Sequence, residues 1–219
     1  RGGGVEFSAH RDYAPGDDLR RLDWRAFARN DRLYIKQFEQ EVHAAVAIFV
    51  DTSASMTLRD NTDGEGVDKW AQVQVLAAAI ALIVGHQGDA VGLEFSGQPD
   101  LIVRSAAGAA QMTRVVATLA AARPQGSAGL AELGGHHGGG APGLAGQRPS
   151  QSGVVIALSD VLSEPLAAVA PLARLRRTGR DVLLLHTLHP LELRFEFGAA
   201  VELHCAETEV RMRVEPRAV

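Results

Sequence analysis

Short apolar runs alternate along the chain with longer segments of helical character. Residues 44–50 form an uninterrupted run rich in Val, Ala and Ile that ends at Asp51. Runs at 154–158 and 182–185 have the same character, and a weaker one covers 90–95. Short apolar runs bounded by polar residues are typical of strands buried on both faces. The pattern therefore predicts four buried strands.

Helical segments separate these strands. Residues 67–86 are apolar around nearly the whole helix, which predicts a largely buried helix. Residues 107–122 and 164–177 are further helix candidates. Gly88 and Gly179 stand where glycine commonly ends a helix. Alternating strands and helices predict an α/β domain, with a mostly parallel sheet and helices on both of its faces.

Three segments depart from this alternation. Residues 1–42 carry many charges of both signs together with aromatic residues, which disordered tails lack, so we expect an ordered extension packed on the main domain, residues 43–219. Residues 124–152 are rich in glycine and predict a long flexible loop. Residues 201–214 alternate roughly between apolar and polar positions and predict an edge hairpin.

Composition narrows the classes of function. The net charge of -4 gives no support for nucleic-acid binding, which needs a basic face. The single cysteine, Cys205, excludes an internal disulfide, and we expect it to be buried. The longest apolar run, residues 75–84, is about half of the roughly 20 residues that a membrane span needs. We expect a cytoplasmic protein, membrane-associated only through a longer native chain.

Oxygen-bearing side chains follow two of the predicted strands. Asp51, Ser53 and Ser55 form an Asp-x-Ser-x-Ser turn, and the run 154–158 ends in Ser159 and Asp160. Ligands bind beyond the carboxyl ends of parallel strands, where these side chains would converge. Hard oxygens in a compact cluster suit Mg²⁺ or Mn²⁺. The alternative is that these residues only cap a helix or form turns.

The Asp51–Ser55 turn resembles the metal-ion-dependent adhesion site of von Willebrand factor A domains. The wider sequence resembles a bacterial family called domain of unknown function 58, in which a similar N-terminal block leads into this turn. The residues that carry this resemblance are Glu6, Phe7, Ser8, Arg11, Asp12, Tyr13, Pro15, Gly16, Asp17, Asp18, Arg21, Leu22, Asp23, Trp24, Ala28 and Arg29. Residues 181–186, Pro190 and Glu192 extend it, whereas His189 stands where the family has Asp.

The resemblance implies a von Willebrand factor A-like fold and a metal site. Ser53 and Ser55 match the direct hydroxyl ligands, and Asp51 and Asp160 match acidic residues that act through water. The adhesion site also takes a Thr from the loop after the second helix. Ser127 is the nearest candidate here, so the metal shell is incomplete by this pattern.

The resemblance also implies a partner, a MoxR-type AAA+ ATPase, and a role in protein maturation or complex assembly. We expect a binding protein rather than an enzyme, with an acidic side chain of the ATPase or of a client protein completing the metal shell. One alternative is a metal-free structural A domain that binds through its N-terminal block or the 124–152 loop. A metal-dependent phosphoesterase is a further alternative. No Walker A motif or Gly-x-Ser-x-Gly elbow is present, and Ser53 cannot replace the general acid of a haloacid dehalogenase-type phosphatase.

Two other groups of residues allow a functional and a plain interpretation. Arg11, Arg20, Arg21 and Arg25 could form a partner-binding surface, but pairing with the interleaved aspartates is the favoured interpretation. The adjacent histidines at 136 and 137 could bind zinc, but their glycine-rich surroundings favour a flexible loop.

Overall fold

The chain divides into two compact units, Arg1–His43 and Ala44–Val219. Their mutual arrangement is not described, so packing of residues 1–42 on the main domain stays a prediction. The structure, a computed structural model, describes residues 5–40, 44–59, 68–133, 136–137, 141–142, 153–162, 165–194 and 200–215.

The first unit is a hairpin with a helical insertion. Strands β1 (Val5–Asp12) and β2 (Tyr34–Gln40) pair antiparallel, and η1 (Leu19–Arg21) and α1 (Trp24–Asn30) lie between them in the chain. Asp23 caps α1 because its Oδ1 accepts hydrogen bonds from the backbone of Arg25 and Ala26 at 3.0 and 3.1 Å. Leu22, Ala26 and Ile35 are buried, which gives this unit a small apolar core.

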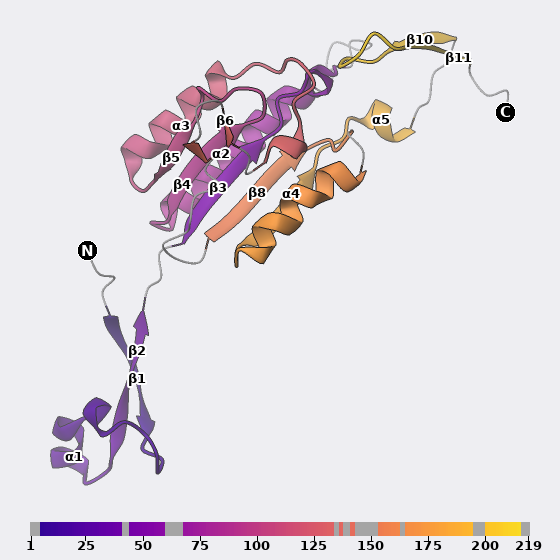
Figure 1. The fold of residues 1–219 in the computed structure, drawn as a ribbon. Coiled ribbons are helices and arrows are strands. Elements are labelled where there is room, and N and C mark those ends of the chain that lie inside the picture. Colours follow the sequence, from indigo (N-terminus) through magenta and orange to yellow (C-terminus); the bar gives the residue numbers. More distant parts are fainter. Residues whose placement is uncertain are drawn as a thin grey trace. The chain divides into compact units, whose positions relative to one another are not determined.

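The second unit is built on a five-stranded sheet with the order β5-β4-β3-β8-β9 (Figure 1). The strands are β3 (Ala45–Val50), β4 (Ala90–Phe95), β5 (Val103–Ala106), β8 (Gly153–Ser159) and β9 (Asp181–His186). All neighbours are parallel except β4 and β5. The four predicted strands are confirmed, whereas the short antiparallel edge strand β5, largely exposed, had no apolar run to reveal it.

Helices cover both faces of this sheet, as predicted. The helices α2 (Lys69–His86) and α3 (Ala109–Ala121) lie together on one face, and α4 (Pro165–Arg177) covers the other (Figure 1). Gly88 and Gly179 both adopt positive φ, at 82° and 83°, two positions after the last residues of α2 and α4. Two short helices, η2 (Ala54–Thr57) and α5 (Pro190–Arg194), follow strands β3 and β9.

Alternation along β3 divides the core into two layers. Val46, Ile48 and Val50 pack toward α2 and α3, whereas Ala47 and Phe49 pack toward α4. Successive side chains of a strand point to opposite faces, so a strand buried on both faces needs an uninterrupted apolar run. The run at 44–50 is therefore explained by the layer on each side of it.

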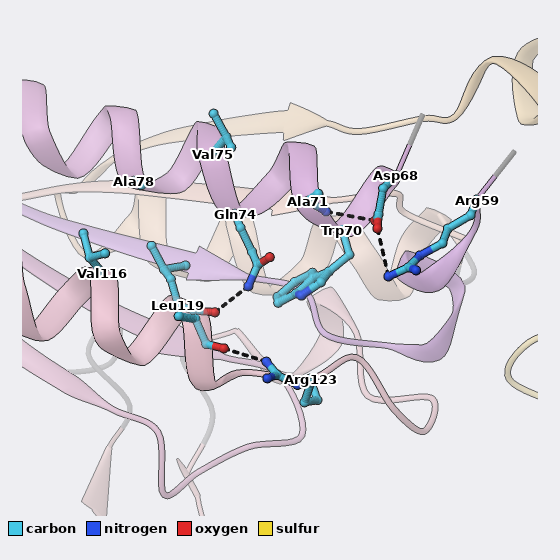
Figure 2. Close-up of a pocket in the computed structure, with 11 residues that line it drawn as sticks. Arg59, Asp68, Trp70, Ala71, Gln74, Val75, Ala78, Val116, Leu119 and Arg123 are labelled. Carbon is cyan, nitrogen blue, oxygen red and sulfur yellow. Dashed lines mark hydrogen bonds and ion pairs between the residues drawn. The ribbon is translucent and has the colours of Figure 1, made fainter. Parts of the chain in front are cut away.

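Helix α2 is less buried than its composition predicts. Val75, Leu82 and Ile83 are 69%, 53% and 60% exposed, so the prediction of a largely buried helix is wrong. The reason is that α2 lies in an outer layer and turns only one side to the sheet. Among the described residues, α2 is the one helix long and apolar enough to cross a membrane, by length and composition alone. A groove of about 510 Å³ runs between α2 and α3 (Figure 2).

The segment 124–152 contains more regular structure than predicted. Helix η3 (Leu130–Glu132) packs under α4, and β6 (His136–His137) pairs with β7 (Ala141–Pro142). Residues 134–135, 138–140 and 143–152 of the predicted loop lie outside the described residues.

The predicted C-terminal hairpin is present, but it is not at an edge of the main sheet. Strands β10 (Val201–His204) and β11 (Arg211–Val214) form a two-stranded sheet of their own. Cys205 lies in the turn of this hairpin and is exposed, so the expectation that it is buried is wrong. A turn that packs under no apolar layer leaves the thiol in contact with solvent.

Candidate functional site

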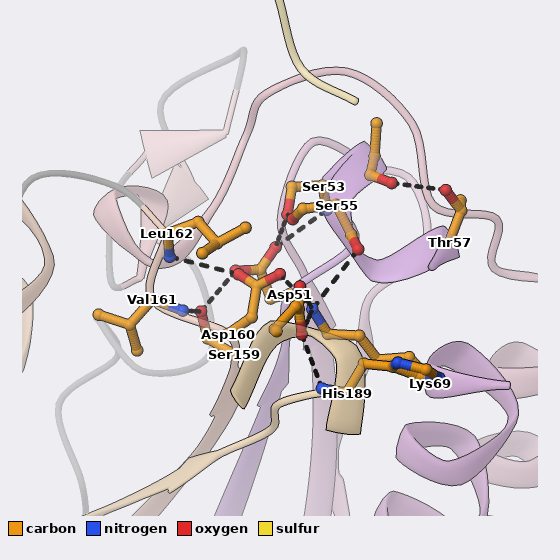
Figure 3. Close-up of polar contacts among 12 residues, drawn as sticks. Asp51, Ser53, Ser55, Thr57, Lys69, Ser159, Asp160, Val161, Leu162 and His189 are labelled. Atoms are coloured by element: carbon orange, nitrogen blue, oxygen red, sulfur yellow. Dashed lines mark hydrogen bonds and ion pairs between the residues drawn. The ribbon is translucent and has the colours of Figure 1, made fainter. Parts of the chain in front are cut away.

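Polar residues follow three adjacent parallel strands at one edge of the sheet. Asp51 follows β3, Ser96 follows β4, and β8 ends in Ser159 with Asp160 next. Figure 3 shows Asp51, Ser159 and Asp160 close together. The registers of β3 with β4 and of β3 with β8 place these ends side by side. The carboxyl edge of an open parallel sheet is where ligands bind in this class of fold.

The carboxylate of Asp51 lies at the centre of a network of serine hydroxyls. Its Oδ1 accepts from the backbone N and Oγ of Ser53, at 2.9 and 2.7 Å, and from Ser96 Oγ at 3.3 Å. Its Oδ2 accepts from Ser159 Oγ at 2.6 Å. Asp51 is only 2% exposed, so these donors replace the water that the carboxylate loses on folding.

The hydroxyl groups of the two serines in the turn lie next to each other. Ser53 Oγ and Ser55 Oγ are 2.9 Å apart, and these residues are 3% and 7% exposed. Octahedral Mg²⁺ binds oxygens at 2.0–2.1 Å, so two neighbouring ligands lie about 2.9 Å apart. The hydroxyl spacing therefore suits a pair of adjacent ligands as well as a hydrogen bond.

A second loop runs beside the turn. The backbone N of Ala54 donates to Gly126 O, and that of Gln125 donates to Thr52 O, both at 2.8 Å. A Cβ added to Gly129 would lie 3.3 Å from Asp51 Oδ2, so this loop closes tightly on the carboxylate. Ser127 lies between these contacts, but its side chain is exposed whereas the other four candidate ligands are buried.

Asp160 pairs with a lysine that the sequence did not single out. Lys69 Nζ donates to Asp160 Oδ2 at 2.7 Å and to both carboxylate oxygens of Glu192, at 2.9 and 3.0 Å (Figure 3). The Lys69 and Asp160 side chains are 3% and 2% exposed, and that of Glu192 is 16% exposed. One ammonium thus joins the first residue of α2 to the end of β8 and to α5.

The backbone beside Asp160 is strained. Val161 has a φ of 52°, in the left-handed region that β-branched residues rarely adopt. Its N donates to Ser159 Oγ at 3.0 Å, and the N of Leu162 donates to Asp160 Oδ1 at 3.4 Å. Such strain persists only where the surroundings enforce it, and it is common at functional sites.

The surroundings of Asp51 change the pKa of its carboxyl group. Burial raises the pKa of Asp51, and the negative charge of Asp160 raises it further. Hydrogen bonds from Ser159 and Ser53 oppose this rise without cancelling it. The folded protein therefore disfavours the charged form of Asp51 when no cation is near.

The charge count of the cluster fits a divalent cation. The cluster contains three carboxylates, on Asp51, Asp160 and Glu192, and Lys69 pairs with the last two of them, which leaves two formal negative charges. Buried charges in proteins are paired or bind metals. The described residues contain no group of three or more His, Cys, Asp or Glu side chains arranged to hold a metal, so hydroxyls would have to complete the shell.

Sequence reasoning assigned no role at the site to three members of this network. Ser96 follows a strand, as Asp51 does, so its place in the chain was a usable signal. Glu192 entered only through the family resemblance. Lys69 is the one charged residue within α2 apart from the terminal histidine, but only the fold shows that it turns toward the sheet edge rather than to solvent.

The arginines of the first unit differ in their surroundings. Arg11 donates to Asp17 Oδ1 at 2.7 Å, and this hydrogen bond lowers the pKa of Asp17. Arg20 and Arg25 are exposed, and the side chain of Arg21 lies outside the described residues. Pairing with an aspartate therefore accounts for Arg11, and a partner surface at these arginines stays a prediction.

The structure defines a doubly wound α/β domain with a buried polar cluster at the carboxyl edge of its sheet. The sequence matches the family described as "Protein of unknown function DUF58" over residues 9–219. The chain therefore belongs to the DUF58 family, as its motifs indicated. No curated protein matches the sequence.

Solved structures that are similar to this chain include the following two. The VWA domain of SpRpn10 has a TM-score of 0.36 and 10% sequence identity, with 66% of this chain and 88% of that chain covered. An uncharacterized membrane spanning protein from Vibrio fischeri has a TM-score of 0.30 and 18% identity, with 81% of this chain and 82% of that chain covered.

Proposed function

We propose that this chain is a metal-dependent protein-binding domain whose site is the cluster at the carboxyl edge of the sheet. The observation that carries the proposal is the pair of buried hydroxyls of Ser53 and Ser55, held 2.9 Å apart beside the Asp51 carboxylate. Ser53 and Ser55 would hold Mg²⁺ or Mn²⁺ directly, and Asp51 and Asp160 would balance its charge. The bound ion would supply a Lewis-acidic position that takes an acidic oxygen of a partner.

A cavity beside the cluster offers a route for that partner group. It has a volume of about 640 Å³ and is lined by Ser55, Thr57, Leu162, Glu192 and the hairpin turn at residues 204–207, among others. Ser55 thus faces both the Asp51 network and an open space. A side chain of a partner protein that enters this cavity would lie next to Ser55.

The resemblance that suggested the site also suggests the partner. We propose a MoxR-type AAA+ ATPase, or a client protein handed to it, as the source of the acidic group. In this proposal the chain acts as an adaptor in protein maturation or complex assembly, in the cytoplasm, and catalyses no reaction of its own. A panel of phosphate esters with Mg²⁺ should therefore show no turnover.

The test is capture of the ATPase by the immobilised chain. We expect capture in the presence of Mg²⁺, loss of capture with a chelator, and loss with Asp51→Ala even when Mg²⁺ is present. Thr113→Ala is the control, because Thr113 is exposed on α3, does not line the cavity and donates its hydroxyl to Ala109 O rather than to the cluster. Capture by Asp51→Ala at wild-type affinity would exclude the proposed mechanism.

A metal-free interaction domain is the second candidate, and two observations favour it. Lys69 already places a positive charge on Asp160, and Ser127 is exposed, unlike the four buried candidate ligands. In that case the chelator would leave capture of the ATPase unchanged, while substitutions on the binding surface would abolish it.

A further inference from the structure

Lys69 occupies a position that is unfavourable for a lysine in two respects. It is the first residue of α2, where the positive end of the helix dipole repels a cation. Its side chain is also 3% exposed, so the ammonium has lost nearly all of its water. Both costs are offset by Asp160 and Glu192, which accept its hydrogen bonds at 2.7 to 3.0 Å.

The carboxylates that Lys69 contacts differ in their relation to the proposed metal site. Asp160 is one of the four buried candidate ligands, and its negative charge acts on Asp51. Glu192 belongs to α5, and its Oε2 also accepts from the backbone N of His189 at 2.7 Å. Lys69 therefore competes for one candidate ligand, while Glu192 draws the ammonium toward the C-terminal segment.

We propose that Lys69 sets the metal affinity of the cluster and that Glu192 moderates its effect. This inference rests on the metal site of the proposed function. The ammonium occupies Asp160 Oδ2 and adds a positive charge beside the turn, so it weakens the binding of a divalent ion. Glu192 partly neutralises that charge and so restores part of the affinity.

A site restrained in this way responds to its partner. An acidic group added by a partner supplies the negative charge that Lys69 offsets, and coupling between two ligands is reciprocal. Metal and partner then bind more tightly together than either binds alone. A purely structural ion pair would instead hold α2, β8 and α5 together without any preference for the charge of the metal site.

The experiment is calorimetric titration of the full chain with Mg²⁺, repeated with Mn²⁺, on wild type and four variants. Lys69→Met should tighten binding roughly tenfold, because it removes one positive charge a few ångströms from the ion. Glu192→Gln should weaken binding by a similar factor while it keeps an oxygen that can accept from His189 N. The double variant K69M/E192Q restores two net negative charges and should bind within about threefold of wild type.

The fourth variant, Arg194→Met, is the control for net charge. Arg194 also lies on α5, but its side chain is exposed, so its removal should leave the affinity unchanged. Cooperative thermal unfolding should be recorded for every variant. If Lys69→Met fails to fold, Glu192→Gln alone decides: weaker binding supports the proposal, and unchanged or tighter binding overturns it.

The outcomes separate this inference from the proposed function. Binding by wild type that Lys69→Met weakens or leaves unchanged overturns the role of Lys69 and leaves the metal site intact. Binding that appears only in Lys69→Met supports the role of Lys69 but overturns metal dependence of the native chain. No binding by wild type or by any folded variant overturns both.

Discussion

Asp51 accepts four hydrogen bonds and still has a raised pKa. The loss of water on burial outweighs the hydroxyl donors that surround it, and the neighbouring Asp160 adds to the cost. A residue held in this way destabilises the metal-free protein near neutral pH. Such a cost at a sheet edge, next to the strained backbone of Val161, is typical of a binding site rather than of a core.

The first prediction concerns the pH dependence of stability without metal. Because the folded pKa of Asp51 lies above the unfolded value of 3.8, its stabilising contribution is complete below 3.8 and is lost as the pH rises through the folded pKa. The side chain of Asp51→Asn does not ionise, so this variant does not lose stability in this way as the pH rises. In a chelator, the free energy of unfolding of the variant minus that of wild type should therefore increase as the pH rises from 3.8 through the folded pKa of Asp51.

Urea unfolding at a series of pH values measures this difference. The test is how the stability difference changes with pH. Its absolute value is not the test, because the amide of Asp51→Asn also changes the hydrogen bonds with the serines at every pH. A difference that stays constant, or falls, as the pH rises would show that folding does not raise the pKa of Asp51.

The second prediction uses the close approach of Gly129. A Cβ at this position would lie 3.3 Å from Asp51 Oδ2, which is tighter than most contacts of a Cβ. The φ of Gly129 is -121°, so alanine avoids the strain that a positive φ would impose. Gly129→Ala should weaken Mg²⁺ binding several-fold by displacing the carboxylate, as changes around metal ligands commonly do. Calorimetric titration of wild type and the variant, both shown to be folded, would measure this loss of affinity. An unchanged affinity would place the ion away from Asp51 Oδ2.

At the scale of elements, β3 and α2 differ in how well their sequences describe them. The run at 44–50 predicted β3 because both of its faces meet apolar layers, so every position carries the same signal. The composition of α2 predicted burial all round, yet only one face of the helix is covered. Nothing in the local sequence shows which neighbours a helix has, and so the exposure of Val75 or Ile83 required the fold.

Only part of the site was predictable, again because the local sequence does not show which elements pack together. Asp51 and Asp160 follow apolar runs, and the rule that parallel strands align their carboxyl ends brings them together. Lys69 and Glu192 belong to other elements, and their contact depends on the packing of α2 and α5 around the sheet edge. Ser127 was placed by analogy with the family pattern, and the structure shows that this residue is exposed.

The third prediction compares two valines of α2. Val73 is 1% exposed and packs against the sheet, whereas Val75 is 69% exposed. Val73→Ala should lower the free energy of unfolding by about 2 kcal/mol, the sum of lost burial and the cavity left behind. Val75→Ala should change it by less than about 0.5 kcal/mol. Denaturant unfolding of the two variants measures both, and equal effects would contradict the orientation of α2.

At the scale of the whole molecule, every member of the proposed site belongs to the unit Ala44–Val219. The N-terminal unit contains its own capped helix and its own small core. The metal site of the proposed function therefore lies wholly within the larger unit.

The fourth prediction follows from this division. Removal of residues 1–43 should leave the Mg²⁺ affinity of the remaining chain within about twofold of the full chain, because no ligand is lost. Thermal unfolding of the shortened chain would first establish that it folds. A fragment that folds but does not bind Mg²⁺ would show that the N-terminal unit contributes to the site.

The measurement that tests the central claim most directly is Mg²⁺ titration of wild type against Ser53→Ala and Ser55→Ala, with Thr57→Ala as the control. All three substitutions remove one hydroxyl from the same turn, but only Ser53 and Ser55 point into the Asp51 network. The account predicts saturable binding by wild type and Thr57→Ala and its loss in both serine variants. Equal binding by all four proteins, or binding by none, would contradict a metal site at this turn.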